Sequence, residues 1–386
     1  MSKNVQIVSN LRDLSELDEK SIIICFDIDL QNRLRKKNIK YFNILNFLNT
    51  TDYQKINSLS YKIRNNFLNK LEDIDQVDYS KSLNNLFSFN LRYFINFLAI
   101  QLILIKKIAK KYKPKIIRIS GYQEKKSIIA NDIIFSFLLK DYLKKKKIKI
   151  ISKIENRDKK INNSNILKYL LSIILNNSIR IYNKLFYDKK KSILVLSPDY
   201  GLEYLVKKIS EKYKDYSIMF LEHSYFSDLN NIFFNKIYYY FNKNKKIENK
   251  EREKIVNFYK KKIIKHKNIF KFQNYNLTKN ILNYFELFLS KEIFKFNEKI
   301  NLANNYFIKN KPKLIISHNS FLMGHFLAEF SRYNNIPSLV ISHGTHTFNK
   351  DKKIFSEWKE SSKYLMNPLY DYIGAQSPLT NNFLIK

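Results

Sequence analysis

Short β-branched apolar runs alternate along this chain with longer segments in which apolar residues recur at every third or fourth position. The short runs predict buried strands, and the longer segments predict helices with one apolar face. Their alternation predicts βα units, a mainly parallel sheet and an α/β fold with long helices. The predicted strands are residues 22–26, 116–120, 148–151, 193–196, 218–221, 314–317, 339–342 and 372–375; the predicted helices are residues 53–71, 83–112, 125–146, 202–213, 255–267, 277–309 and 321–333.

The domain organisation follows from length and from one polar interruption. A chain of 386 residues favours two domains or one large α/β domain. The polar stretch "SKIENRDKKINNSN" (152–165) precedes an amphipathic segment at 166–186 and then a new strand. We therefore predict an α/β region at 1–152, a polar linker with an amphipathic helix at 153–189, and a second α/β region at 190–386.

Charge and cysteine usage narrow the class of protein. The formal net charge is +36, mostly from lysine, and part of it reflects a composition typical of A/T-rich codons. The rest of the positive charge favours anionic partners, whereas the scarcity of arginine argues against sequence-specific recognition of nucleic acid. A single cysteine, Cys25, indicates a cytoplasmic protein. The apolar run 93–105 is too short to span a membrane, so we expect a buried helix and only peripheral contact with a membrane.

Polar side chains follow two predicted strands near the C-terminus. His318 and Asn319 come directly after the strand at 314–317, and His343 comes directly after the strand at 339–342. In a right-handed βαβ unit both loops open at the same edge of the sheet. His318 and His343 are therefore expected across one crevice, separated by one strand spacing of ~5 Å or two of ~10 Å.

An imidazole in such a crevice can act as a general base or, when protonated, stabilise charge on a phosphate. His343 is the main catalytic candidate, and the backbone N–H groups after Gly344 could bind an anion. A histidine at a strand end also commonly serves only to hydrogen-bond a neighbouring carbonyl, and that alternative stays open. Asp27 and Asp199 are weaker acid/base candidates, for which helix or loop capping is the commoner role. No cysteine lies near these loops and no HExxH motif is present, so no metal site is predicted.

The segment "KPKLIISHNSFLMGHFLAEFSRYNNIPSLVISHGTH", followed by "YDYIGAQSP", resembles bacterial surface-polysaccharide glycosyltransferases of the GT-B type. The resemblance implies Rossmann-like parallel sheets and transfer of a sugar from a nucleotide sugar to a hydroxyl of capsule, O-antigen or a similar glycan. It implies no metal or other cofactor beyond the nucleotide sugar as co-substrate. The excess of lysine would help such a protein associate peripherally with the anionic inner face of the cytoplasmic membrane, near a lipid-linked acceptor. The residues that the resemblance places at the substrate are His318, Asn319, Gly344, Thr345, His346 and Ser377, with His343 as the catalytic residue.

The position of the His-Gly pair leaves two alternatives for the organisation of the chain. In GT-B enzymes a second Rossmann-like domain normally follows this pair, yet few residues follow it here. Residues 1–386 could therefore form an N-terminal half whose donor domain is missing, fused elsewhere or supplied by another polypeptide, the alternative favoured by the position of the motif. Alternatively, 1–152 and 190–386 are both Rossmann-like, which the total length favours. Two other functions stay open: a non-catalytic remnant or partner subunit of a split glycosyltransferase, and a basic nucleic-acid-associated protein.

Overall fold

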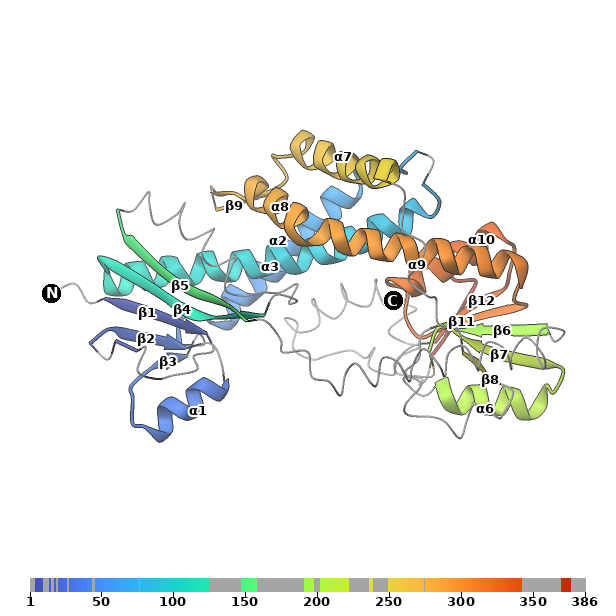
Figure 1. Cartoon of the computed structure of the whole chain (residues 1–386), viewed down its shortest axis with the longest axis horizontal. Helices are drawn as coiled ribbons and strands as arrows, with labels where there is room; N and C mark the ends of the chain where they lie inside the picture. The colour runs from blue at the N-terminus through green and yellow to red at the C-terminus, as the bar shows by residue number, and fades with distance from the viewer. Residues whose placement is uncertain are drawn as a thin grey trace. The chain divides into compact units, whose positions relative to one another are not determined.

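The computed structural model of the chain (Figure 1) confirms the α/β fold class with parallel sheets and long helices. The predicted helices at 125–146 and 166–186 lie outside the residues that it describes. The described residues are 4–9, 14, 17–18, 20–25, 28–43, 46–75, 77–124, 147–157, 191–197, 202–221, 236–238, 249–273, 275–341 and 369–375.

The first sheet has five strands in the order β3-β2-β1-β4-β5, and every pair of neighbours is parallel. This is the 3-2-1-4-5 order of a Rossmann sheet. The central strand β1 was absent from the predicted strands, and β5 runs past the predicted domain end at residue 152. The strands are β1 (Val5–Ser9), β2 (Ile22–Cys25), β3 (Phe42–Asn43), β4 (Ile116–Glu124) and β5 (Lys149–Arg157).

The second sheet has six strands in the order β13-β12-β11-β6-β7-β8, again all parallel. Counted along the chain from its first strand, β6, this is the full 3-2-1-4-5-6 Rossmann order. The chain thus contains two sheets of Rossmann type. The strands are β6 (Lys191–Val195), β7 (Tyr216–Phe220), β8 (Lys236–Tyr238), β11 (Leu314–Ser317), β12 (Ser338–Ile341) and β13 (Tyr372–Gly374).

Helices fill the connections between the strands. A two-stranded antiparallel hairpin of β9 (Lys271–Phe272) and β10 (Tyr275–Asn276) precedes α8. The predicted single helix at 277–309 is a continuous helical run with a π-helical middle, η5 (Phe285–Leu289), between α8 (Thr278–Tyr284) and α9 (Ser290–Lys309). The other helices are α1 (Ile28–Lys36), α2 (Thr50–Leu68), α3 (Ser80–Tyr112), α6 (Leu202–Lys212), α7 (Asn249–Lys265) and α10 (Met323–Tyr333).

Both faces of the first sheet are covered by apolar side chains. Val5, Ile7 and Ile117 cluster with Ile105 and Ile108 of α3. The alternate residues of the same strands form a second cluster, which includes Val8, Ile23 and Cys25 together with Leu30 and Leu34 of α1. Alternation between two buried faces explains why every residue of β2 is apolar. In the second sheet, α6 packs its apolar face against β6, β7 and β11.

Helix α3 contains the long apolar run noted in the sequence. Its length and its mean hydropathy of 1.5 over the most apolar window would suffice for a membrane span, but 67% of that window is buried within the fold. The core helix of a globular protein meets the same criterion of length and composition. Leu98, Leu102 and Ile105 are almost completely buried. The burial agrees with the expectation of a buried helix.

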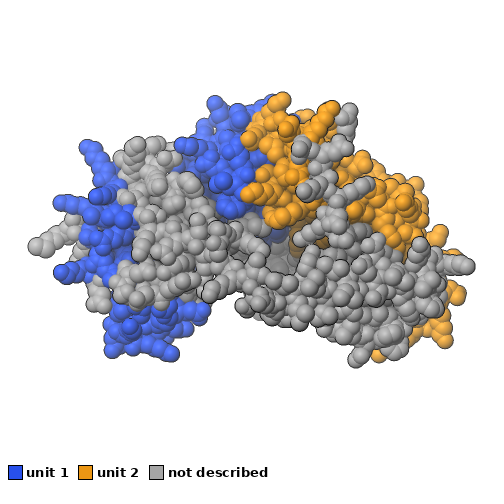
Figure 2. All heavy atoms as spheres, viewed as in Figure 1, with its two compact units in different colours: residues 1–67, 89–160, 262–289 blue, residues 68–88, 161–261, 290–386 orange. Residues whose placement is uncertain are grey.

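The residues group into two compact units (Figure 2), each built from three separate stretches of the chain. The first unit holds the first sheet, and the second unit holds the second sheet. The predicted boundaries at 152 and 190 stay predictions. Unit 1 comprises Met1–Phe67, Phe89–Lys160 and Lys262–Leu289; unit 2 comprises Leu68–Ser88, Ile161–Lys261 and Ser290–Lys386.

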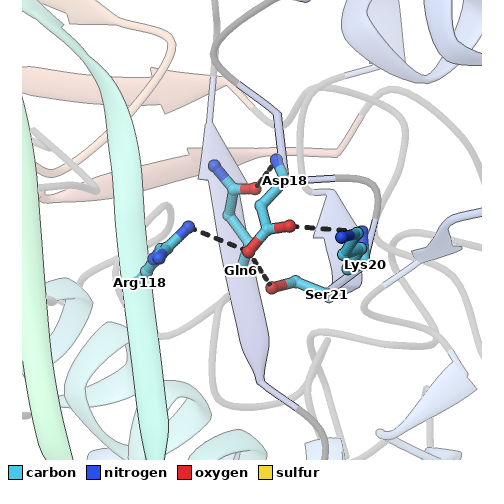
Figure 3. Close-up of polar contacts among 5 residues, drawn as sticks. All are labelled: Gln6, Asp18, Lys20, Ser21 and Arg118. Carbon is cyan, nitrogen blue, oxygen red and sulfur yellow. Dashed lines mark hydrogen bonds and ion pairs between the residues drawn. The ribbon is translucent and has the colours of Figure 1, made fainter.

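A polar cluster at Asp18 stabilises the loop between β1 and β2 (Figure 3). The Asp18 carboxylate accepts hydrogen bonds from the Lys20 N–H and from the Ser21 hydroxyl, and it pairs with Arg118 at 2.8 Å. The Asp18 N–H donates to Gln6 Oε1, and Gln6 is the register partner of Arg118 on β4. Asp18 precedes the first residue of β2, so the cluster lies at the amino ends of the strands. Ligands of such sheets bind at the carboxyl ends, and we therefore assign the cluster a structural role.

Candidate functional site

The second sheet has its topological switch point between β6 and β11, where the strand order reverses. Connections leave these two strands in opposite directions, and in folds of this kind ligands bind outside the carboxyl ends of the strands at that point. The Leu196 N–H donates to the Ile316 carbonyl at 2.9 Å, which continues the β6–β11 pairing beyond the last residue of β6. Ser197 and His318 therefore lie side by side at the carboxyl ends of these two strands, each just past the end of its own strand.

These two residues and Asn319 form one hydrogen-bonded group. Ser197 Oγ lies 3.2 Å from His318 Nδ1, and Asn319 Nδ2 lies 2.8 Å from His318 Nε2. All three residues are buried, with relative exposures of 3% for Ser197 and 7% each for His318 and Asn319. Buried polar groups are costly unless they are hydrogen-bonded, and the group satisfies both ring nitrogens of His318 with neutral partners.

The loop that carries Asn319 is itself tightly held. The Asn319 carbonyl accepts a hydrogen bond from the Ser317 hydroxyl at 2.7 Å, and Asn319 Oδ1 accepts one from the Phe321 N–H at 3.2 Å. A β-carbon at Gly324 would overlap the Asn319 carbonyl oxygen and stand 2.5 Å from Oδ1, so only glycine allows this approach. The Tyr370 hydroxyl donates to the Gly324 carbonyl at 2.5 Å, and burial raises the pKa of that hydroxyl, which keeps it a donor.

The turn into α10 is strained at Leu322, whose φ of 52° and ψ of −121° suit glycine rather than a side chain. The turn is closed by the Gly324 N–H, which donates to the Phe321 carbonyl at 3.0 Å. Strain of this kind costs about 1–3 kcal/mol and concentrates at binding sites, where the surroundings hold it in place. The predicted helix at 321–333 therefore begins later than expected, at Met323.

The structure places two of the predicted site residues, His318 and Asn319, directly after β11, at the carboxyl edge of the second sheet, and their role in binding stays a prediction. Strands β11 and β12 are direct neighbours, with Ser317 opposite Val340. The two strands are therefore one strand spacing of ~5 Å apart, the shorter of the two expected separations. The remaining candidates lie outside the described residues and stay predictions: Asp27, Asp199, His343, Gly344, Thr345, His346 and Ser377.

Ser197 was not predicted. Its only sequence signal is its position directly after the buried run that forms β6, and that signal becomes informative once β6 is known to adjoin β11.

A second buried histidine, His325, has a structural role in the same unit. Its Nδ1 lies 3.2 Å from the hydroxyl of Ser82, which donates to the Glu329 carboxylate at 2.5 Å. The carboxylate also accepts the Ser82 N–H in the first turn of α3, where the helix dipole favours an anion. Burial raises the pKa of Glu329, and the bonds from Ser82 oppose that rise. This group ties α10 to the start of α3.

Among the described residues, no group of three or more histidine, cysteine, aspartate or glutamate side chains could hold a metal ion. The chain matches no protein-family model. It also matches no curated protein sequence. One solved structure that it matches is UDP-GlcNAc 2-epimerase from Neisseria meningitidis bound to UDP-GlcNAc. The match has 11% identity and a TM-score of 0.19, and it covers 99% of this chain and 89% of that one. A likeness at this level establishes neither a shared fold nor a shared activity, so the site must be assessed from its own geometry.

Proposed function

We propose that this chain binds a nucleotide sugar at the carboxyl edge of its second sheet and transfers the sugar to a hydroxyl of a bacterial surface glycan. The observation that carries the proposal is the buried Ser197–His318–Asn319 group at the switch point of a sheet with the full Rossmann order. In folds with this order, the crevice at the switch point binds nucleotide phosphates, often against a helix N-terminus. Helix α10 begins at this edge, directly after the loop that contains His318 and Asn319.

The roles of the other residues follow the predicted chemistry. His343 is proposed as the base that removes the proton of the acceptor hydroxyl, or as a contact to the leaving phosphate. Gly344, Thr345 and His346 would form the loop around it, and Ser377 would contact substrate beyond β13. The leaving diphosphate would be balanced by helix N-termini and basic side chains, without a bound metal.

The net charge of +36 supports anionic partners: the nucleotide diphosphate, a lipid-linked acceptor and the membrane surface that bears it. We accordingly propose peripheral association with the inner face of the cytoplasmic membrane. The same charge permits contact with nucleic acid. The buried switch-point group favours a small nucleotide ligand, because long nucleic acids are held by exposed phosphate contacts.

The test is binding of UDP-, GDP-, CMP- and dTDP-sugars, measured by titration calorimetry on the whole chain. His318→Gln is the test variant and His325→Gln the matched control: both histidines are buried, and each has a serine Oγ 3.2 Å from Nδ1. We expect at least one sugar nucleotide to bind, His318→Gln to weaken it roughly tenfold or more, and His325→Gln to bind as the wild type does.

Two results would count against the proposal. A wild-type chain that binds none of the sugar nucleotides would refute it. If His318→Gln and His325→Gln weaken sugar-nucleotide binding equally, the effect comes from a general loss of packing and not from the site. If binding is found, hydrolysis or transfer of the donor should be lost in His343→Ala, and unchanged activity there would remove His343 from the catalytic role.

A further inference from the structure

The orientation of the Asn319 side-chain amide is determined by its neighbours. A backbone N–H can only donate, so the atom that receives the Phe321 N–H at 3.2 Å must be the amide oxygen, Oδ1. The amide nitrogen therefore points to His318 Nε2, at 2.8 Å. Since the amide NH₂ group donates and cannot accept, Nε2 must accept, and an accepting ring nitrogen carries no proton.

This direction fixes the tautomer of His318. A neutral imidazole with an unprotonated Nε2 carries its proton on Nδ1, and the partner of Nδ1 is Ser197 Oγ at 3.2 Å. Nδ1–H therefore donates to Ser197. The Ser197 oxygen is thus engaged as an acceptor, while its own hydroxyl proton has no acceptor among the described residues.

We infer that Ser197 is the ligand-contacting group of this site, and that His318 is a positioning residue locked as the Nδ1–H tautomer by Asn319. The hydroxyl proton of Ser197 is left to donate to an anionic oxygen, such as a phosphate oxygen of a nucleotide. In this arrangement His318 is not a general base, because one ring nitrogen carries the proton and the lone pair of the other is occupied by Asn319. The ligand part of this inference rests on the proposed function, whereas the tautomer does not.

Nitrogen-15 NMR tests the tautomer on the whole chain labelled at histidine, near neutral pH. The His318 signals are assigned as those that disappear in His318→Gln. We expect a protonated Nδ1 and an unprotonated Nε2. In Asn319→Asp the carboxylate keeps an acceptor for the Phe321 N–H but offers no donor to the ring, so the proton should appear on Nε2. Finding the proton on Nε2 of His318 in the wild type, or finding it on the same nitrogen in Asn319→Asp as in the wild type, would show that Asn319 does not fix the tautomer.

Calorimetry with the sugar nucleotide that binds best tests the role of Ser197. Ser197→Ala removes only the hydroxyl, and a lost hydrogen bond to a charged phosphate should weaken binding roughly tenfold to a hundredfold. Ser82→Ala is the control: Ser82 Oγ also lies 3.2 Å from the Nδ1 of a buried histidine, His325, but Ser82 belongs to α3 rather than following a strand of the sheet, so affinity should be unchanged.

The outcomes separate the two proposals. If the wild type binds a sugar nucleotide and Ser197→Ala binds it equally well, the role of Ser197 is wrong and the proposed function stands. If the wild type binds none, the proposed function and the ligand role of Ser197 both fail, and the NMR result alone decides the tautomer.

Discussion

Substitution of Gly324 by alanine tests whether the close approach between α10 and the Asn319 loop holds the site together. The new β-carbon would overlap the Asn319 carbonyl oxygen, which is backbone and cannot simply rotate away. The loop must therefore move, which would disrupt two hydrogen bonds to Asn319, one from the Ser317 hydroxyl at 2.7 Å and one from the Phe321 N–H at 3.2 Å.

The size of the effect follows from opposing contributions. Two neutral hydrogen bonds contribute about 1 kcal/mol each, and forced overpacking of a filled site costs about 1–3 kcal/mol. Alanine improves helix propensity by at most about 1 kcal/mol over glycine. The net destabilisation expected for Gly324→Ala is therefore about 2–4 kcal/mol. For a unit of this size, that lowers Tm by roughly 4–16 °C.

Thermal unfolding followed by circular dichroism measures the change, with Gly374→Ala as the control. Gly374 lies in β13 of the same unit, and a β-carbon there would come closest to the Ile341 side chain, at 3.3 Å, while the Leu339 side chain and the Ile341 Cα stand at ordinary contact distances of 3.7 and 3.8 Å. We expect that variant to stay within about 1 °C of the wild type, as a tolerated surface-type change does. Gly324→Ala should lower both Tm and the affinity for the nucleotide, whereas Gly374→Ala should change neither. Equal Tm values for Gly324→Ala and the wild type would refute the reasoning, because the loop would then accommodate the extra carbon without cost.

Two further predictions concern buried polar groups in unit 2. Tyr259→Phe should lower the free energy of unfolding by about 1–3 kcal/mol in a denaturant titration. The buried Tyr259 hydroxyl donates to Asn84 Oδ1 at 2.9 Å, and its removal leaves that oxygen unpaired. An unchanged free energy of unfolding would contradict this pairing. Because folding raises the pKa of Glu329, its contribution to stability is fully present below the ordinary glutamate pKa and is lost as pH rises through the raised value. Glu329→Gln, which keeps an acceptor for Ser82, should therefore gain stability relative to the wild type as Tm is measured from mildly acidic to neutral pH, and a constant difference would contradict this.

Much of the fold was predictable because the buried strands are short apolar runs. The strand at 314–317 has the predicted bounds, and each of the other predicted strands begins or ends within two residues of an observed strand. Strands β3, β8, β9 and β10 were not predicted, and they are only two or three residues long. Strand β1 was missed because its second residue, Gln6, is polar yet almost completely buried. The Asp18 N–H satisfies Gln6 Oε1, and that contact comes from a loop whose position no local pattern reveals. The π-helical turn of η5 was also invisible, since apolar spacing alone does not distinguish it from an α-helix.

The candidate site was predictable only in part. His318 and Asn319 were predicted because polar residues directly after a buried strand lie at the ligand edge of a parallel sheet, and the structure places them there as a pair. Ser197 was not found, because its importance depends on β6 being the neighbour of β11, although more than a hundred residues separate them in the sequence. The tautomer of His318 depends on one backbone N–H, that of Phe321, and on hydrogen-bond directions that composition and spacing do not encode.

The interleaving of the two units affects how the protein can be dissected. Leu68–Ser88 belongs to unit 2, although it precedes most of that unit by many residues. This stretch supplies Ser82 to Glu329 and Asn84 to Tyr259. A fragment that begins near residue 190, just before β6, would contain the whole second sheet. It would, however, leave the buried Glu329 carboxylate without the Ser82 N–H and hydroxyl that donate to it. Separate expression of unit 2 would therefore require residues 68–88 to be supplied in the same polypeptide, for example by circular permutation, rather than a single cut.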